Sequence, residues 1–344
     1  MSYTGVQKLL HNIALSSSIM KEFAFDLERL LLRSRCNMNV DGQHIFISGL
    51  ARSGTTILLN ELHKSDQFSC LTYADMPFVM APNIWDKMYG TFISKSQFQK
   101  ERAHGDGITI NLGSPEAFEE IFWKTFKDEK THQLEVITLD DDIKQKFIWF
   151  VQAVLIKNNK RRYLSKNNIN FLRLNSIREM FPNAIFLVPF RNPFQHAFSL
   201  LNQHKRFSSS QKKDAFITKY MNWLGHNEFG EGYQAFQNKQ HIFLNPNELN
   251  HWLEQWHSVY SFIYKKVQYD SNNTLLINYD ALCDAKQNIW QQLIKKININ
   301  ECDQPNFRLS EKEINETYDQ CQLEKCMDLH SKLTELSENL LRNS

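Results

Sequence analysis

Two short segments of this 344-residue chain carry residue types suited to binding phosphate or sulfate groups. The first runs from Gly49 to Thr56 and reads GLARSGTT, with two glycines at G-x-x-x-x-G spacing. It follows a short apolar run and precedes a helical pattern. Such a loop turns several backbone N–H groups toward one point, where the helix dipole adds positive charge. The spacing also fits an ordinary strand–helix turn, but it favours an anion site formed by Arg52, Ser53, Gly54, Thr55 and Thr56.

Position 55 indicates which kind of anion the loop suits. In loops that bind ATP, a Lys follows the second glycine and contacts the β- and γ-phosphates. Thr55 stands there in this chain, so a triphosphate would lack its main cationic partner. A single phosphosulfate group needs a smaller cradle and one cation, which Arg52 supplies from within the loop.

The second segment, from Phe190 to Ser199, begins at the end of a buried apolar run. Arg191 stands at the predicted C-terminal end of a strand, and Ser199 lies on the helix that Pro193 begins. Both side chains can therefore face one anion at the edge of a parallel sheet, where such sheets bind ligands. Taken alone, Arg-Asn-Pro is also a common helix start.

Together these segments resemble the PAPS-dependent sulfotransferase superfamily, and the loop is closest to its bacterial and tyrosylprotein-sulfotransferase-like branches. The resemblance covers residues 44–75 and 160–296. It implies transfer of a sulfuryl group from 3′-phosphoadenosine 5′-phosphosulfate (PAPS) to an acceptor hydroxyl or amine, leaving adenosine 3′,5′-bisphosphate (PAP). It implies that the loop holds the 5′-phosphosulfate and that Arg191 and Ser199 hold the 3′-phosphate. The Gly-rich C-terminal loop of the cytosolic aryl and steroid branch is absent, since no Gly follows Gly232.

The same resemblance assigns two further residues. Lys166, at the end of a short strand, matches the lysine that stabilises the leaving phosphate oxygen. Tyr279 matches a tyrosine near the adenine or the 3′-phosphate, although a buried structural Tyr is nearly as well supported. Because sulfuryl transfer is an in-line displacement governed by positioning and charge, backbone amides, Arg52 and Lys166 suffice without a metal.

The acceptor also needs a base, and two residues are candidates. Asp75 lies about where related protein-tyrosine sulfotransferases carry a catalytic Glu. His104 lies in a Gly-flanked loop, and the ordinary pKa of a histidine suits a base at neutral pH. We favour Asp75 slightly over His104, with Glu119 and Glu120 as weaker options.

The fold expected from these patterns is α/β: a P-loop-type central parallel sheet flanked by helices, in one domain of 1–344. It comprises an N-terminal helical segment over 1–40, a mostly helical insertion over 66–142 that shapes the acceptor site, and a C-terminal helix over 310–344. Strands are predicted at 44–48, 162–165, 184–190 and 274–278. The main helices are predicted at 6–32, 55–63, 142–160, 171–181, 193–207, 246–266, 284–296 and 315–342. A further helix is predicted to begin at Ser114-Pro115, and Asn245 is the predicted cap of the 246–266 helix.

Composition restricts the partners. A net charge of +2 gives no electrostatic case for nucleic acid. The six cysteines show neither a disulfide framework nor metal-ligand spacing, which is typical of a reducing compartment. With no signal peptide and no transmembrane run, we expect a cytoplasmic protein. The acceptor is a small-molecule, lipid or carbohydrate alcohol, and a homo-oligomer is compatible with the composition. Two other functions stay open: a P-loop nucleotide kinase and a non-catalytic nucleotide-binding scaffold.

Overall fold

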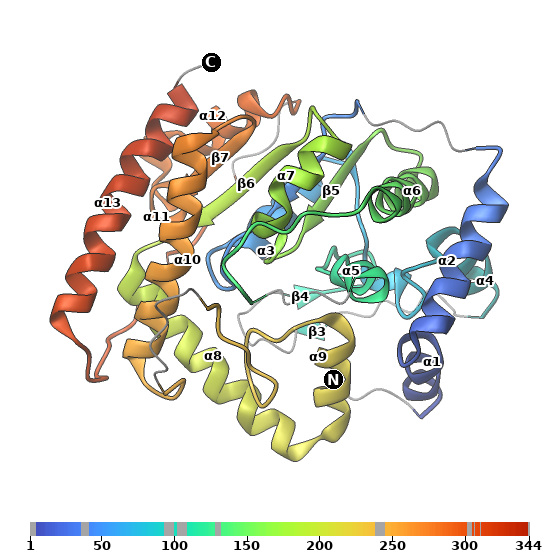
Figure 1. The fold of residues 1–344 in the computed structure, drawn as a ribbon, viewed down its shortest axis with the longest axis horizontal. Helices are drawn as coiled ribbons and strands as arrows, with labels where there is room; N and C mark the ends of the chain where they lie inside the picture. The colour runs from blue at the N-terminus through green and yellow to red at the C-terminus, as the bar shows by residue number, and fades with distance from the viewer. Residues whose placement is uncertain are drawn as a thin grey trace.

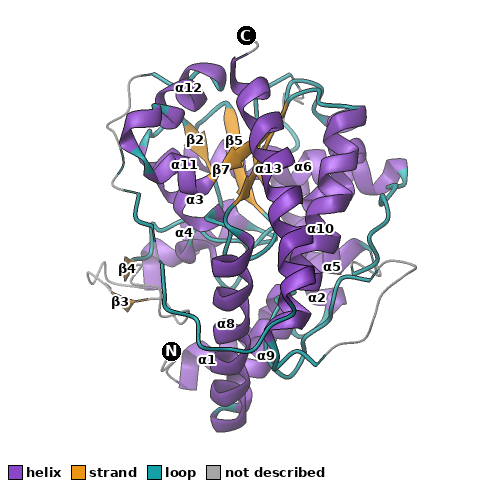
Figure 2. Ribbon diagram, turned by 90° about the vertical axis from the view of Figure 1, so that its left-hand side faces the viewer, coloured by secondary structure: helices purple, strands orange, loops and turns teal. Residues whose placement is uncertain are grey.

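A five-stranded parallel sheet forms the centre of the molecule (Figures 1 and 2). The computed structural model describes residues 5–35, 41–92, 100–101, 109–127, 132–237, 245–300, 305, 307–309 and 311–342. The strand order is β2-β5-β1-β6-β7. The strands are β1 (Ile45–Ile47), β2 (Phe68–Ser69), β5 (Arg162–Lys166), β6 (Ile185–Phe190) and β7 (Thr274–Asn278). A separate two-stranded pair, β3 (Lys100–Glu101) and β4 (Thr109–Ile110), is antiparallel.

Successive side chains of the strands point to opposite faces of the sheet and belong to separate apolar clusters. In β1, Ile45 and Ile47 pack with one apolar cluster and Phe46 packs with the other. Because successive strand side chains point to opposite faces, both faces are covered by helices. On the Ile45 face lie α3 (Thr55–Lys64), α11 (Tyr279–Cys283) and α12 (Ile289–Lys296).

The Phe46 face carries a larger helical layer. Its cluster includes side chains from α1 (Gly5–Leu15), α2 (Ser18–Leu32), α5 (Glu120–Phe126), α6 (Asp141–Asn158), α7 (Asn170–Met180) and α9 (Ala215–Leu224). Next to this layer lies α4 (Pro82–Phe92), which contacts α6. A third cluster joins the end of the sheet to α8 (Pro193–Lys213), α10 (Leu249–Tyr269) and α13 (Gln320–Arg342). Short 3₁₀ turns occupy Tyr73–Asp75 and Ala285–Gln287.

The structure confirms the predicted fold class and the four predicted strands. It also shows an edge strand, β2, inside the 66–142 region, where it pairs with the beginning of β5. Pro189 lies beyond the last residue that pairs with β1, so its missing N–H interrupts no bond to that strand. Within the described residues, no helix combines the length and apolarity required to cross a bilayer.

Four predicted helix boundaries are wrong. No helix begins at Ser114: its hydroxyl accepts from the Asn111 N–H in a turn, Pro115 bridges to Thr72, and the helix starts at Glu120. Asn245 caps no helix, because its side chain accepts from the Asn247 N–H within a turn, and α10 begins at Leu249.

The other two errors concern the C-terminal part of the chain. The 284–296 helix is split at Asn288, whose backbone is left-handed (φ 52°). The last helix starts at Gln320 rather than at 315.

Candidate functional site

The C-terminal ends of four neighbouring strands bring most of the predicted donor residues to one edge of the sheet. Lys166 ends β5, the 49–54 loop follows β1, Arg191 follows β6, and Tyr279 follows β7. Because these strands are adjacent and parallel, their ends must meet at the same edge. Lys166 is paired in register with Ile47, directly before the loop.

Positive φ angles shape the loop after β1. Gly49 (φ +135°) and Gly54 (φ +104°) adopt backbone conformations that side chains rarely tolerate, and Arg52 also has a positive φ, of 70°. A Cβ added to Gly54 would lie 2.4 Å from the ring of Tyr279. The loop is therefore held by close contact with the segment after β7, and α3 begins at once with Thr55 and Thr56.

The structure brings Arg52 and Ser199 together, whereas the sequence patterns paired Ser199 with Arg191. The Arg52 Nε donates to the Ser199 hydroxyl at 3.3 Å, which links the loop to α8. A second link comes from buried His196, whose Nε2 lies 2.8 Å from the Ala51 carbonyl oxygen. Because a carbonyl only accepts, Nε2 carries the proton. Burial, with the charges of Arg191 and Arg52, lowers the pKa of His196 to about 3, so this imidazole is neutral.

Arg191 is buried at the junction of three elements. The turn it occupies is held by the Asn192 N–H, which donates to Asp280 at 2.5 Å, and by the Asn192 side chain, which caps α8. The positive charge of Arg191 reaches the buried phenols of Tyr260 and Tyr279, where it opposes the rise in pKa that burial causes. Arg191 thus places a cation within electrostatic range of Tyr279.

An acidic group that the sequence did not single out lies against the turn that follows Lys166. The Asn168 amide donates to Glu228 at 2.8 Å, and His226 Nδ1 lies 3.5 Å from the same carboxylate. Burial raises the pKa of Glu228, but His226 above all, with Asn168 and the charge of Lys166, lowers this pKa to about 2. A histidine and a carboxylate therefore stand against the turn that follows the predicted leaving-group lysine.

The signal for this pair was the short glycine-rich stretch around it. Gly225 and Gly230 both have positive φ, so the chain from α9 turns sharply and returns to the sheet edge between them. A Cβ on Gly225 would lie 2.5 Å from the Glu120 side chain. The chain has only 11 glycines, so two of them as close together as Gly225 and Gly230 indicate that the backbone there approaches another element closely.

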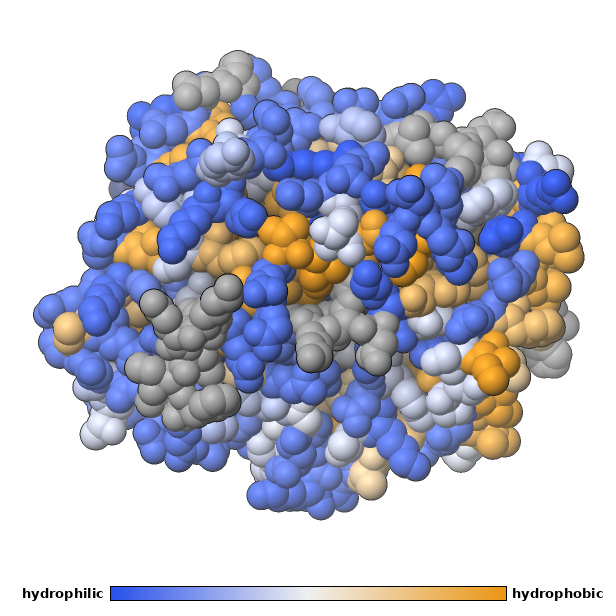
Figure 3. Space-filling model, in the orientation of Figure 1, coloured by the Kyte–Doolittle hydropathy of each residue, from blue (hydrophilic) through white to orange (hydrophobic). Residues whose placement is uncertain are grey.

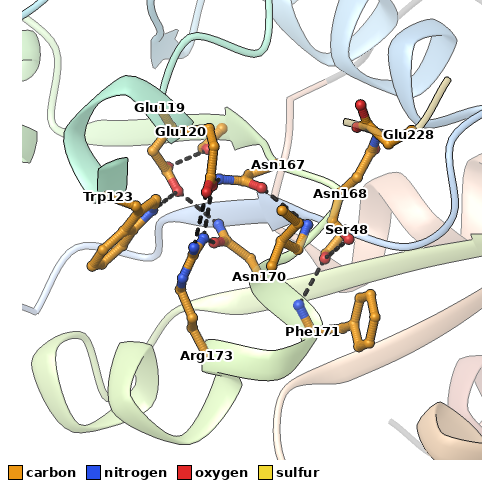
Figure 4. Close-up of polar contacts among 12 residues, drawn as sticks. Ser48, Glu119, Glu120, Trp123, Asn167, Asn168, Asn170, Phe171, Arg173 and Glu228 are labelled. Carbon is orange, nitrogen blue, oxygen red and sulfur yellow. Dashed lines mark hydrogen bonds and ion pairs between the residues drawn. The ribbon is translucent and has the colours of Figure 1, made fainter. Parts of the chain in front are cut away.

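Glu119 and Glu120 form a buried network beneath the residues that follow Lys166 (Figure 4). Glu119 accepts from the side chains of Trp123, Tyr163, Ser165 and Asn170. Glu120 accepts from Asn167 at 2.7 Å and forms a two-pronged pair with Arg173 at 2.9 and 3.0 Å. Both carboxylates are thus occupied by donors, and their evident effect is to fix the 167–170 turn.

Of the two favoured candidates for the base, the structure describes only Asp75. Asp75 is buried, accepts from the Thr72 N–H at 2.7 Å and pairs with Lys157 at 2.6 Å. Lys157 lies in the last turn of α6, which leads into the start of β5, whereas Lys166 ends that strand. The structure therefore does not bring Asp75 into contact with the donor residues. His104 lies outside the described residues.

The residues at the sheet edge fit a donor with two separated anionic groups. The Ser53 hydroxyl is buried in the loop near the phenol of Tyr260: burial raises the pKa of this phenol, and a hydrogen bond with Ser53 opposes the rise. The loop also presents the N-terminus of α3, whose N–H groups suit an anion. Arg191 and Ser199 supply a cation and a hydroxyl to one side of this loop. Among the described residues, no cluster of three or more His, Cys, Asp or Glu has the arrangement of a metal site.

Comparisons with known proteins bear on the fold and on the family. No curated protein matches the sequence. The fold is similar to the crystal structure of sulfotransferase STF1 from Mycobacterium tuberculosis H37Rv, with a TM-score of 0.51 and 11% identity, covering 99% of this chain and 87% of that one. Sulfotransferase STF9 from Mycobacterium avium matches with a TM-score of 0.47 and 8% identity, covering 95% of this chain and 77% of that one.

A model of the Sulfotransferase family matches residues 44–303, which is most of the chain. The match includes the loop after β1, Lys166, Arg191, Ser199 and Tyr279. The chain therefore belongs to the sulfotransferase family and is an enzyme that transfers a sulfuryl group.

Proposed function

We propose that the sulfuryl donor is PAPS and that the chain transfers its sulfuryl group to an acceptor hydroxyl or amine. The observation that carries this proposal is the contact of Arg52 with Ser199 at 3.3 Å, which joins the 5′-phosphosulfate loop to the 3′-phosphate segment. A 3′-phosphate is what distinguishes PAPS from ATP, and Arg191 with Ser199 would bind it. Tyr279 would pack near the adenine or this phosphate.

The proposed chemistry is one in-line displacement. The acceptor oxygen or nitrogen bonds to sulfur while the bond between sulfur and the 5′-phosphate oxygen breaks, and PAP leaves. Lys166 and Arg52 neutralise the oxygens on which charge develops, together with the N–H groups of Ser53 to Thr56. One preorganised donor of this kind contributes about 3 kcal/mol to lowering the barrier.

For the base we propose the pair formed by His226 and Glu228. Glu228 orients the imidazole, and its bond from the Asn168 amide holds the pair against the turn that follows Lys166. Asp75 stays the alternative from the sequence, but its carboxylate is taken up by Thr72 and Lys157.

The acceptor-binding surface would come from the 66–142 region together with the turn that carries Glu228. Burial lowers the pKa of His132, and the negative charges of Glu228 and Glu120 oppose this shift. His132 is therefore within electrostatic range of this turn. The acceptor class remains the one expected from the sequence: a small-molecule, lipid or carbohydrate alcohol.

The direct test is turnover of sulfur-labelled PAPS against a panel of alcohol and amine acceptors. Wild-type protein should label at least one acceptor, and Lys166→Ala should lower kcat about a hundredfold or more. Lys205→Ala is a matched control on the exposed surface of α8. Undiminished turnover in Lys166→Ala would remove this lysine from the mechanism. PAP binding without turnover on any acceptor would favour the scaffold function.

A further inference from the structure

The outer face of α1 and α2 exposes an unusual amount of apolar surface. Eight of the thirteen exposed large apolar side chains among the described residues belong to α1 and α2 or the turn between them. Figure 3 shows apolar side chains gathered at the right-hand edge of the molecule, where Figure 1 places these helices. Monomeric proteins rarely leave a large contiguous patch of this kind open to water. The eight are Leu9, Ile13, Ile19, Met20, Phe23, Leu27, Leu30 and Leu31.

The sequence of α2 shows two apolar stripes rather than one. Its inner side buries residues 21, 25, 28 and 32 against the body of the protein. Its outer side repeats Met20, Phe23, Leu27 and Leu30 at spacings of three and four. Leu30 is 67% exposed and Phe23 is 63% exposed, so this second stripe has no partner within the described chain. A three-and-four repeat is the pattern by which one helix packs along another.

Charged residues border this outer stripe on one side only. Glu22 lies in the N-terminal half of α2 and Asp26 just past its middle, whereas Arg29 lies near its C-terminal end and Arg33 follows that end. All four are exposed. At 100° per residue they fall along one flank, between the inner and the outer stripe. Like charges four residues apart repel each other, and the attraction of Asp26 to Arg29, three residues on, offsets only part of that repulsion.

We propose that α2 packs against α2 of a second copy of this chain, antiparallel and about a two-fold axis. In that arrangement Glu22 and Asp26 of each copy face Arg33 and Arg29 of the other, while the apolar stripes meet. The helix dipole accounts for the order of the charges along α2, with acidic residues before basic ones. It does not account for the position of all four charges on one flank beside the apolar stripe. A parallel two-fold pairing would leave the two charged flanks on opposite sides of the interface, where they could not pair with each other. A lipid surface favours a basic rim, and this rim is half acidic.

Sedimentation velocity of the full chain tests the proposal by charge reversal. Wild-type protein should form a dimer in a concentration-dependent way. Glu22→Lys/Asp26→Lys makes the flank wholly basic, and Arg29→Glu/Arg33→Glu makes it wholly acidic. Each variant alone should raise the dimer dissociation constant roughly tenfold to a hundredfold, since four paired charges become repulsive.

Mixing gives the decisive result. An equimolar mixture of the basic and acidic variants should regain dimers, and so should the variant that carries all four reversals. Glu313→Lys/Glu335→Lys changes the net charge equally at exposed positions elsewhere, and should dimerise like wild type. Phe23→Ser/Leu30→Ser, which removes apolar contact at exposed positions, should be monomeric. PAP binding should be the same in all of these variants.

Three outcomes would overturn the proposal. Wild-type protein could stay monomeric up to about 100 µM, a concentration at which weak homodimers associate. Dimers could persist unchanged in both charge-reversal variants, which would place the interface elsewhere. Monomeric protein could instead co-sediment with vesicles of phosphatidylcholine and phosphatidylserine and lose this binding in Phe23→Ser/Leu30→Ser, which would assign the patch to a lipid surface.

Discussion

At the scale of single residues, two carboxylates compete for the role of the base that serves the acceptor. Glu228 contacts Asn168, in the turn after Lys166, and His226, while Asp75 is paired with Lys157 near the start of β5. Glu228→Gln should therefore lower kcat about a hundredfold or more with donor binding retained, because one base is typically responsible for that much. His226→Asn should act in the same direction.

The matched comparison is Asp75→Asn. This change breaks a buried ion pair, so it should lower the melting temperature while leaving kcat per folded molecule nearly intact. The two readouts, turnover with the best acceptor and thermal unfolding, separate the two roles. Loss of turnover at unchanged stability in Asp75→Asn, with Glu228→Gln fully active, would return the base to Asp75.

Gly54 offers a residue-scale test of the loop. Its φ of +104° and the Tyr279 ring 2.4 Å from an added Cβ leave no room for a side chain. Gly54→Ala should destabilise the protein by about 1–3 kcal/mol and weaken PAP binding, because the loop must move away from the segment after β7. Gly5→Ala, where nothing lies within 4 Å, is the control and should be nearly neutral in chemical denaturation. Wild-type stability in Gly54→Ala would contradict the loop geometry.

At the scale of elements, the buried Glu120–Arg173 pair should hold the turn that follows Lys166. Arg173 is fully buried and lies on α7, while Glu120 begins α5. Arg173→Met leaves a buried carboxylate without its cation, which should cost about 3–5 kcal/mol in unfolding free energy. Glu120→Gln/Arg173→Met should recover part of that loss.

Lys144→Met is the control for this element-scale prediction. Lys144 pairs with exposed Asp141 and Glu179, and such surface pairs contribute little to stability. Equal losses in Arg173→Met and Lys144→Met, measured by denaturant unfolding, would show that the network beneath Lys166 stabilises nothing specific.

Elements with a clear apolar period were predictable, and elements decided by tertiary contacts were not. The strands at 45–47, 185–190 and 274–278 are short buried apolar runs, and the sequence showed them directly. Ser114 and Asn245 looked like helix caps, but each side chain instead bonds within a local turn, which competes with a cap for the same donor types. The strand β2 was missed because two residues carry no periodic signal.

The residues of the candidate site also fall into a predictable group and an unpredictable one. The predictable residues lie in or next to strand–helix junctions, whose motifs are local in sequence, so we could predict that they converge. They are Arg52, Lys166, Arg191, Ser199 and Tyr279. The position of Glu228 could not be predicted, because its contact with Asn168 depends on the path of the chain from α9 back to the sheet. Only the glycines that permit this path were visible in the sequence.

At the scale of the whole molecule, buried histidines should make stability depend on pH. Burial lowers the pKa of six described histidines, so the unfolded chain binds more protons near their ordinary pKa of about 6.5. Their stabilising effect is complete above that pH and is lost as the pH falls below it. The six are His63, His132, His196, His204, His257 and His330.

Denaturant unfolding at pH 7.5 and 5.5 measures this loss. His196, with a pKa of about 3, should alone account for about 1.4 kcal/mol per pH unit below 6.5. His196→Gln should therefore show a smaller difference between the two pH values than wild type. A free energy of unfolding that rises from pH 7.5 to pH 5.5 would contradict the neutral state of these histidines.

The central claim, that the sheet edge binds a nucleotide with phosphates at both its 3′ and 5′ positions, is tested most directly by calorimetric titration. PAP should bind more tightly than 5′-AMP or ATP with Mg²⁺. Arg191→Ala should weaken PAP about tenfold to a hundredfold and leave 5′-AMP nearly unchanged, because a charge-assisted contact to the 3′-phosphate is lost. Arg206→Ala, exposed on the same helix as Ser199, should bind PAP like wild type. Binding of ATP with Mg²⁺ and none of PAP would contradict the account and favour a nucleotide kinase.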